Sequence, residues 1–391
     1  MSIFSIWPMA LIIGTGVAFL SIPRVFAFLD SPPAVNPHRL DSLDGIRGFL
    51  AVGVFFHHIT IGTYGAKTGH PGMGVSHFYS FLGPAAVSVF FMITGYLFWD
   101  KLLKRDGAVA WLDLYVNRLF RIYPMYLVLM IAYFIIAYAF TVGEVTQPLG
   151  VLVHQAAQWL ALGVVKDPTP FLDNPNILPV VGQTWSLRYE WLFYASLPIL
   201  SVFARGKSSV AITASALFLV LSSSALDDSY RWFVAEFLCG MLTASLLRTY
   251  PTVRGDGTVK SIVATVLGVA AFMSSTSPYS AMPTLLLGTA FFLIASGASA
   301  FGILHTAGAK RLGNMSYSIY LLHGLLIAIV MTRPGVMPYA IGSDPQFWTV
   351  VALLFLLIIT ISAFTFTVVE RGGIRLGRKI KSPRNASSVA A

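Results

Sequence analysis

The chain has 391 residues, of which 56% are hydrophobic and only 11% are charged. Soluble domains carry roughly 25% charged residues, so this composition excludes an ordinary soluble domain and predicts a protein that folds in a bilayer. The net charge is +10, but the basic residues stand in short loops between apolar runs, where they indicate topology and not nucleic-acid binding. The one cysteine, Cys239, excludes a disulfide framework and a Cys-rich metal site, so we expect no metal.

Several apolar runs approach the length of about 20 residues that a helix needs to cross a hydrocarbon core of about 30 Å. They predict an all-α fold, a polytopic membrane helical bundle with about eleven transmembrane helices. The first run lacks a basic n-region and a small-residue cleavage site, which favours a membrane helix over a removed signal peptide. The expected spans are residues 6–28, 46–63, 80–99, 119–140, 185–203, 209–226, 230–248, 260–277, 282–303, 313–332 and 347–369.

The stretch 141–184 is ambiguous, because residues 151–165 are apolar but too short to span comfortably. If they span, Arg205 and Lys207 fall on the opposite side from the other basic loops. If they lie in the interface or re-enter, nearly all Lys and Arg residues share one side, which the positive-inside rule favours. We therefore expect an external N-terminus, a cytoplasmic C-terminus and a long external loop at 141–184. The basic residues left outside are Lys67, Lys166, Arg188, Arg231 and Arg333.

The second expected helix carries the richest set of ionisable residues, and such groups inside a membrane are costly and therefore functional candidates. Asp44, Arg47 and His58 line one stripe, because their spacing places His58 within about 20° of Arg47 around the helix and about 16 Å along it. His57 lies about 100° off that stripe. Histidine can accept a proton at neutral pH, as a general base acting on a hydroxyl must. The alternative is a histidine that bonds a helix neighbour beside an interfacial Asp–Arg pair.

Arg118 and Arg121 open the fourth expected helix, with Tyr123 close behind them. Arginines at i and i+3 share a helix face. Two guanidinium groups on one face suit an anionic cofactor that carries phosphates. Ordinary positive-inside anchoring explains the pair equally well.

Two further clusters combine aromatic and ionisable side chains. Glu190 and Tyr194 are one turn apart at the expected outer mouth of the helix 185–203, where Glu190 and His58 could meet; an interfacial aromatic belt is the alternative. Tyr320 and His323 are at i and i+3, a spacing that a simple packing hydrogen bond would also explain.

The pattern resembles the acyltransferase 3 family of membrane acyltransferases, which modify surface polysaccharides, peptidoglycan, lipopolysaccharide and some secondary metabolites. The resemblance runs from Leu43 to Arg371, and several motifs in the same order make it specific. Thr94 stands where Ser is common, which is conservative. The motifs are residues 43–48, Arg47 with His58, residues 90–97, Arg118 with Arg121, residues 185–187 with Glu190, and Ser316-Tyr317 with Tyr320 and His323.

The resemblance implies transfer of an acetyl or other short acyl group from cytoplasmic acyl-CoA to a hydroxyl of a glycan such as O-antigen or exopolysaccharide, at a bacterial inner membrane. It implies that His58 is catalytic with Arg47 in the same site, oriented by Asp44 or Glu190. Arg118, Arg121 and Tyr123 would hold the CoA or the helices around it. The remaining candidates are Gly95, Tyr96, Trp185, Ser186, Tyr194, Tyr317, Tyr320, His323 and Glu370.

The family core of about ten helices agrees with the count expected here minus one extra N-terminal helix. We thus expect an extra helix and cytoplasmic linker at 1–42, the acyltransferase membrane domain at 43–372, and a basic, disordered cytoplasmic tail at 373–391. We expect no fused soluble SGNH-type domain after Glu370, so a mechanism needing one would require a separate protein. Expected partners are membrane lipid, acyl-CoA and a glycan or lipid-linked glycan acceptor, and a homo-oligomer stays open. The competing functions are a proton-coupled transporter or flippase, and an O-acyltransferase that acts on a cytoplasmic small molecule such as a macrolide.

Overall fold

The computed structural model describes residues 2–30, 41–70, 76–141, 147–206, 208–223 and 228–385. Across these ranges every regular element is helical and no strand occurs. The helices form two compact units: unit 1 is Met1–Val109 with Leu197–Ser316, and unit 2 is Ala110–Ser196 with Tyr317–Ala391. The predicted all-α fold is confirmed for the part of the chain described.

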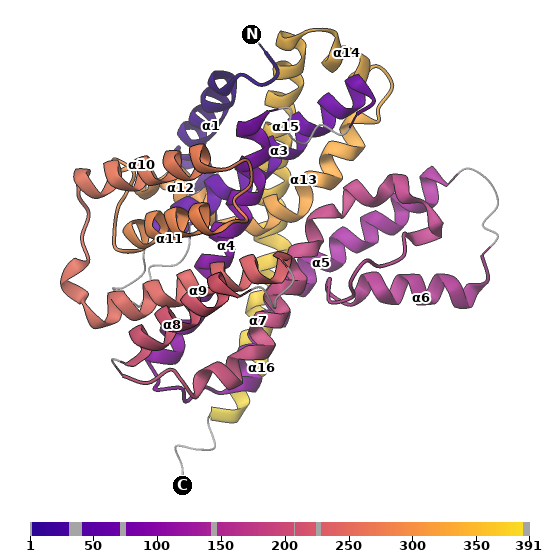
Figure 1. The fold of residues 1–391 in the computed structure, drawn as a ribbon. Helices are drawn as coiled ribbons and strands as arrows, with labels where there is room; N and C mark the ends of the chain where they lie inside the picture. Colours follow the sequence, from indigo (N-terminus) through magenta and orange to yellow (C-terminus); the bar gives the residue numbers. More distant parts are fainter. Residues whose placement is uncertain are drawn as a thin grey trace. The chain divides into compact units, whose positions relative to one another are not determined.

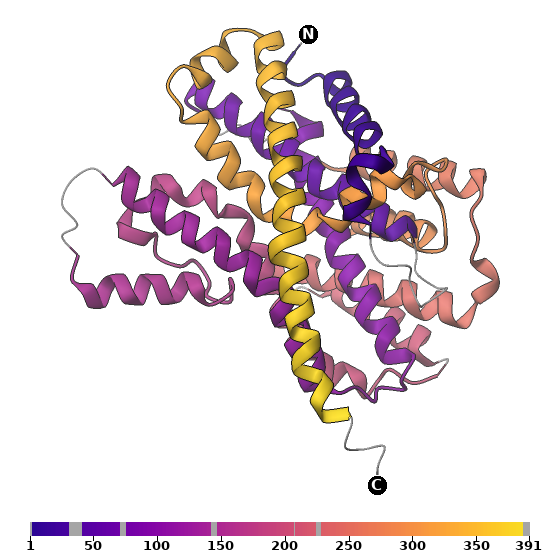
Figure 2. The same ribbon diagram turned by 180° about the vertical axis from the view of Figure 1, so that it is seen from behind.

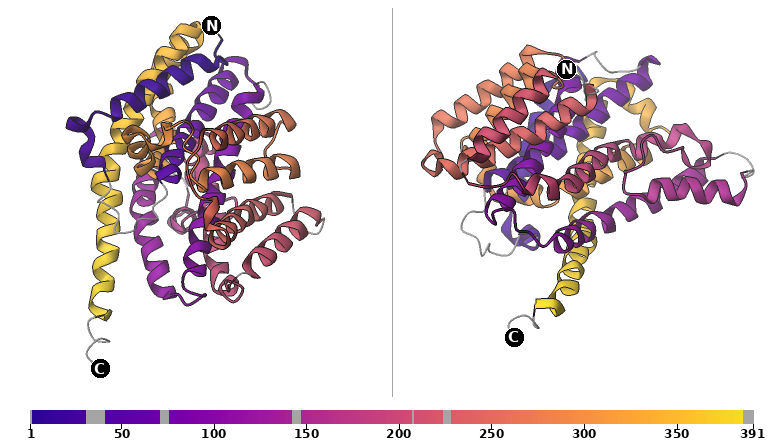
Figure 3. Two further views of the ribbon diagram at one scale, coloured as in Figure 1. Left: turned by 90° about the vertical axis from the view of Figure 1, so that its left-hand side faces the viewer. Right: turned by 60° about the horizontal axis from the view of Figure 1, so that its bottom comes forward.

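In unit 1, helix α4 packs against α3 on one side and α9 on another, while α10 and α11 lie side by side (Figures 1 and 3). The histidine-bearing helix α3 also contacts the short helix α12, which in turn contacts α1. The elements are α1 (Ile6–Leu20), α2 (Pro23–Phe26), η1 (Ala27–Leu29), α3 (Asp41–Thr68), α4 (His77–Leu103), α8 (Ser208–Ser222), α9 (Asp228–Thr249), η5 (Pro251–Val253), α10 (Thr258–Ser274), α11 (Ala281–Ala295), η6 (Ile303–His305) and α12 (Ala307–Asn314).

In unit 2, α15, the π-helical segment η7 and α16 follow one another as one long rod (Figure 2), and α16 packs along α5. Helix α7 runs into unit 1 beyond Ser196, and α13 belongs to unit 2 from Tyr317. The elements are α5 (Trp111–Phe140), α6 (Leu149–Leu160), η2 (Phe171–Asp173), η3 (Pro175–Val180), η4 (Gly182–Thr184), α7 (Trp185–Ser201), α13 (Ser316–Met331), α14 (Val336–Gly342), α15 (Asp344–Thr365), η7 (Phe366–Glu370) and α16 (Arg371–Asn385).

Four helices in the described residues are long and apolar enough to cross a membrane, and the number rises to six if each of two broken helix pairs is one span. Helices α8, α10 and α11 are apolar but shorter. Large apolar side chains on α15, such as Leu353 at 64% and Phe364 at 65%, are exposed, as lipid-facing positions require. A helical membrane protein is thus supported, while the count of eleven spans stays a prediction. The four long helices are Asp41–Thr68, His77–Leu103, Trp111–Phe140 and Asp344–Ile380.

Three predicted spans are not continuous helices, and one of them, 282–303, is helical only as far as Ala295, where α11 ends. The predicted helix 6–28 is broken, and its parts Ile6–Leu20 and Pro23–Leu29 meet at 76°. Pro23 has no N–H to donate, and it forces the preceding Ile22 into extended backbone (φ −66°, ψ 110°). The predicted helix 313–332 is likewise broken at Met315, where α12 ends and α13 begins.

The disorder predicted for the tail 373–391 is wrong as far as Asn385, because α16 is helical to that residue. Gly373 and Gly377 face α5, and a Cβ on Gly377 would lie 2.8 Å from the Cβ of Phe120. Two glycines four residues apart let helices approach closely. The prediction of disorder relied on the charge and serine content of the tail and did not consider this spacing. Residues 386–391 lie outside the described residues, as does 31–40, most of the predicted linker.

Residues 151–160 of the ambiguous segment 151–165 lie in α6, a helix of 12 residues. Its length of about 18 Å is too short for a hydrocarbon core of about 30 Å, in agreement with the topology that keeps it from spanning. The rest of 147–184 is ordered by side-chain bonds: Gln155 bonds Asp173 (2.8 Å), and the Tyr126 hydroxyl donates to the carbonyl oxygen of Trp159 (2.5 Å). Whether this stretch is external stays a prediction.

Candidate active site

The neighbouring histidines of α3 have different surroundings. His57 is 7% exposed, and its Nδ1 lies 2.6 Å from the carbonyl oxygen of Tyr79 on α4. Because a carbonyl oxygen only accepts, Nδ1 carries the proton and donates it. The ring also packs on Gly83, where an added Cβ would lie 2.5 Å from its Cγ. His58 is exposed, so of the two histidines it has the accessible ring that proton transfer with a substrate requires.

The start of α3 is packed by the glycines of its sequence motif. An added Cβ on Gly45 would lie 2.9 Å from the carbonyl carbon of Leu304, and one on Gly48 would lie 2.7 Å from the nitrogen of Gly313. In return, a Cβ on Gly313 would lie 2.7 Å from the carbonyl carbon of Asp44. The Asp-Gly-x-Arg-Gly pattern therefore has a packing cause, and it leaves Asp44 and Arg47 half-buried on α3.

Gly95 and Tyr96, the candidates on α4, lie in the contact between α4 and α9. A Cβ on Gly95 would lie 3.0 Å from the carbonyl carbon of Phe237, and a Cβ on Gly240 would lie 2.8 Å from the nitrogen of Tyr96. Small residues on both helices thus bring the two backbones together. Gly95 is explained by helix packing within unit 1, and a catalytic role for Tyr96 stays a prediction.

Sequence reasoning missed Glu236 on α9. Its side chain is 0% exposed, and neither carboxylate oxygen has a partner at hydrogen-bonding geometry among the described residues. Ser88 of α4 interacts with the carboxylate, but its hydroxyl donates to the carbonyl oxygen of Pro84 (3.1 Å), and no bond of good geometry joins it to Glu236. The signal in the sequence was a lone acidic residue within the expected span 230–248, because such a residue is a functional candidate by default.

In unit 2, a single hydroxyl joins Arg118 to Glu190. The Tyr194 hydroxyl donates to Oε2 of Glu190 (2.9 Å) and also hydrogen-bonds with Arg118. Tyr115 of α5 fixes the backbone of the same residue, since its hydroxyl donates to the carbonyl oxygen of Tyr194 (3.0 Å). Arg121 and Tyr123 are half-buried on α5. The structure thus brings together candidates from two separate sequence motifs.

This contact corrects one prediction. The sequence placed Arg118 at the cytoplasmic opening of its helix and Glu190 in the external half, yet groups that share one hydroxyl lie at the same depth. The prediction failed because the segment before α7 folds back into unit 2: Gln183 donates to the carbonyl oxygen of Leu321 (2.6 Å), and Arg188 donates to that of Val164 (2.9 Å). The predicted placements of Arg118 and Glu190 on opposite sides of the membrane therefore cannot both hold.

The motif around Ser186 packs on the motif around Tyr320. The hydroxyls of Ser186 and Tyr320 lie 2.8 Å apart, and Tyr320 also donates to the carbonyl oxygen of Gln183 (3.0 Å). Nδ1 of His323 lies 2.7 Å from the carbonyl oxygen of Tyr320. Trp185, beside them, is 41% exposed. These candidates form a hydrogen-bonded cluster within unit 2.

Glu370 closes η7, a π-helical segment within the long rod of unit 2, and is 1% exposed. It accepts a hydrogen bond from Ser318 of α13 (3.3 Å), and the neighbouring Tyr317 donates to the carbonyl oxygen of Ile122 on α5 (2.8 Å). Single π-helical turns often mark functional sites. Nothing in the sequence pattern indicated this turn.

His58 belongs to unit 1 and Glu190 to unit 2, so the predicted meeting of the two side chains stays a prediction. Each unit holds a coherent part of the candidate set: the stripe of α3 in one, and the Arg118, Ser186 and Glu370 clusters in the other.

The fold is that of a helical membrane protein, and the order of its motifs is that of a membrane acyltransferase. The model of the acyltransferase domain family matches residues 40–368. The chain therefore belongs to this family, as the sequence motifs indicated. The matched range leaves out the N-terminal segment through η1 and, at the other end, Glu370.

Two relatives support this membership. Acyltransferase MdmB of Streptomyces mycarofaciens is 29% identical over 331 residues, which cover 76% of this chain and 80% of that protein. Exopolysaccharide production protein ExoZ of Rhizobium meliloti (strain 1021) is 28% identical over 324 residues, which cover 80% of this chain and 93% of that protein. No solved structure matches the chain.

Proposed function

We propose that this protein transfers an acetyl or other short acyl group from acyl-CoA to a hydroxyl of a cell-surface glycan, with His58 as the general base. The observation that carries the proposal is the difference between the two histidines of α3: His57 is buried and bonded to Tyr79, whereas His58 is exposed. Family membership supports acyl transfer. Likeness to a protein named for exopolysaccharide production supports the glycan acceptor.

In the proposed reaction a ring nitrogen of His58 removes the proton from the acceptor hydroxyl. The oxygen attacks the carbonyl carbon of the thioester, the carbon–sulfur bond breaks, and the proton passes to the sulfur. The products are an ester and free CoA thiol, with no net gain or loss of protons. Asp44 shares the stripe but lies about 21 Å from His58 along α3, so it does not reach the ring. Direct transfer is favoured over an acyl-histidine relay, because one proton-accepting group completes the balance.

The donor's phosphates are assigned to Arg121, with Tyr123 beside it. A guanidinium group binds phosphate oxygens through two parallel hydrogen bonds, and Arg121 is half-buried on α5. Arg118 already bonds with Tyr194 beside Glu190, which supports a role in holding α5 and α7 together. The proposal thus separates the two arginines, which the sequence motif treats alike.

The test compares His58→Gln with His57→Gln in the full-length protein, assayed in membrane vesicles with labelled acetyl-CoA and normalised to folded protein. Loss of a general base reduces the rate by roughly 10²–10⁴-fold, so we expect that loss for His58→Gln. A glutamine at position 57 can still donate to the carbonyl oxygen of Tyr79, so His57→Gln should stay within severalfold of wild type. Wild-type activity of His58→Gln would refute the assignment.

The acceptor is tested in cells. Mass spectrometry of surface glycans from a deletion strain should show a lost acyl increment that the wild-type gene restores and His58→Gln does not. Unchanged glycans together with a lost acyl group on a cytoplasmic small molecule would move the acceptor to that class. Substrate flux across vesicles without acyl-CoA would instead support a transporter.

A further inference from the structure

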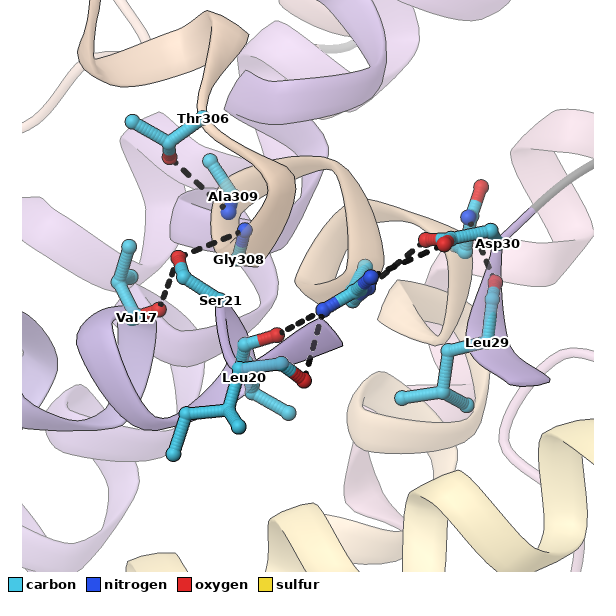
Figure 4. Close-up of polar contacts among 11 residues, drawn as sticks. Val17, Leu20, Ser21, Leu29, Asp30, Thr306, Gly308 and Ala309 are labelled. Carbon is cyan, nitrogen blue, oxygen red and sulfur yellow. Dashed lines mark hydrogen bonds and ion pairs between the residues drawn. The ribbon is translucent and has the colours of Figure 1, made fainter. Parts of the chain in front are cut away.

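The N-terminal segment of unit 1 is joined to α12 by a buried arginine. Arg311 is 3% exposed, and its Nε and Nη2 donate to the two carboxylate oxygens of Asp30 (2.7 and 2.9 Å). Its Nη1 donates to the carbonyl oxygens of Leu20 (2.7 Å) and Ile22 (3.3 Å), at the C-terminal end of α1 (Figure 4). A positive charge is favourable there, because the last carbonyl groups of a helix lack helical partners.

Further contacts surround the arginine and fix the same two pieces of chain. The Asn314 side chain donates to the carbonyl oxygen of Leu29 (3.0 Å). The backbone N–H of Gly308 donates to the hydroxyl of Ser21 (3.1 Å), which itself donates to the carbonyl oxygen of Val17 (2.8 Å; Figure 4). A Cβ on Gly308 would strike that same carbonyl oxygen. Helix α12 is thus held at its start, middle and end by the N-terminal segment.

The other side of α12 is in contact with α3. Gly313 packs against both Asp44 and Gly48, with no room for a Cβ on either glycine. Two polar contacts flank this seam: Lys310 with Asp41 (3.0 Å) and His305 with Ser42 (2.9 Å). Because backbone touches backbone here, a shift of α12 has no side chain to absorb it. A displacement of α12 therefore passes to the turn of α3 that carries Asp44 and Arg47.

We infer that Arg311 is a positioning residue: it fixes α12 on the N-terminal segment and thereby sets the start of α3, whose stripe holds His58. The inference rests on the proposed function, since the stripe matters only if His58 acts in transfer. It gives the N-terminal segment, which precedes the family-matched range 40–368, a task other than anchoring. An apolar contact would anchor equally well, whereas the planar guanidinium fixes direction through four hydrogen bonds at once.

The experiment uses full-length Arg311→Lys, Asp30→Asn and Asp30→Glu. Arg311→Lys keeps the positive charge but cannot form the paired hydrogen bonds to the carboxylate. Asp30→Asn removes the ion pair while Arg311 keeps its bonds to Leu20 and Ile22. Asp30→Asn therefore tests the inference even if Arg311→Lys fails to fold. A misplacement of about 1 Å can reduce a rate about 10²-fold. We expect kcat per folded molecule to fall by about 10–100-fold in Arg311→Lys and in Asp30→Asn. KM for acyl-CoA should stay within about twofold, and the pH profile of kcat should be displaced. Asp30→Glu, which keeps the carboxylate, should recover most of the rate.

Lys310→Met provides the matched control, because Lys310 lies on the same helix but its pair with Asp41 is partly exposed on both sides (38% and 45%). Such pairs contribute little, so kcat should be unchanged. Unchanged kcat and pH profile in folded Asp30→Asn would overturn the positioning role and leave the proposed function intact. Full activity of His58→Gln would overturn both.

Discussion

Replacing Glu236 with methionine should stabilise the protein. The carboxyl group is fully buried in α9, and neither oxygen has a partner at hydrogen-bonding geometry among the described residues. A buried polar group without a hydrogen bond costs about 1–3 kcal/mol, and more when charged. Methionine has a similar length and a flexible, apolar end that fills irregular spaces. Removing the carboxyl leaves no new orphan, because Ser88 already donates to the carbonyl oxygen of Pro84.

We therefore expect Glu236→Met to raise the free energy of unfolding by about 1–3 kcal/mol. Each kcal/mol shifts Tm by roughly 2–4 °C in domains of 150–250 residues, so the rise should be a few degrees. Glu236→Gln keeps the shape and two polar ends that need partners, and should fall between wild type and methionine. The assay is thermal unfolding of the purified chain in one detergent at one scan rate, since irreversible unfolding makes Tm depend on the rate.

A lower Tm for Glu236→Met would refute this reasoning, because it would mean that the carboxyl makes interactions worth more than its burial costs. The same variant also reports on function. Proteins tolerate destabilising groups where activity needs them. A methionine variant that is more stable but transfers less acyl group would assign Glu236 a role in the reaction, whereas full activity would leave it a packing residue.

Three further predictions use matched pairs and thermal unfolding. Gly48→Ala should destabilise the protein by about 1–3 kcal/mol, because its Cβ would lie 2.7 Å from the nitrogen of Gly313. Gly62→Ala on the same helix meets nothing within 4 Å and should stabilise slightly. Equal Tm values for the two variants would contradict the packing of α3 on α12. Gly373→Ala should destabilise the protein and the adjacent Gly372→Ala should not, because only a Cβ on Gly373 meets Phe120 and Pro124 of α5. A tolerated Gly373→Ala would contradict the close packing of α16 on α5. Tyr194→Phe should lower the free energy of unfolding by about 1–3 kcal/mol, because Glu190 and Arg118 lose the hydroxyl that they share. Tyr138→Phe should be neutral, because Tyr138 is 71% exposed on α5. Equal stabilities of the two variants would argue against the shared hydrogen bonds of Tyr194.

Much of the fold was predictable because apolar runs in a bilayer have few alternatives to helices. The ends of α3, α4 and α5 extend several residues beyond the predicted spans, since helices continue into polar flanks that hydropathy leaves out. The break at Pro23 was visible in the sequence but was outweighed by the apolar content around it. The π-helical turn at Glu370 had no such signal, because it depends on how the rod packs and not on which residues it contains.

The candidate site divides in the same way. The motif glycines could be recognised but not explained, because the need for Gly45 and Gly48 depends on Leu304 and Gly313, far away in the chain. Spacing alone placed His58 on the stripe with Arg47, and it separated His58 from His57 before any contact of His57 was known. Arg311 could not be found, since its partners Leu20, Ile22 and Asp30 are recognised only once the N-terminal segment is seen against α12.

The Tyr194 hydroxyl also bears on which step of the reaction Glu190 serves. Arg118 stands about 10 Å from the start of α5, near the end whose basic neighbours predict a cytoplasmic location. Because Tyr194 bonds both Arg118 and Glu190, Glu190 lies at that depth too. In the proposed reaction acyl-CoA arrives from the cytoplasm, so Glu190 belongs with the donor's end of the path and not with an external acceptor.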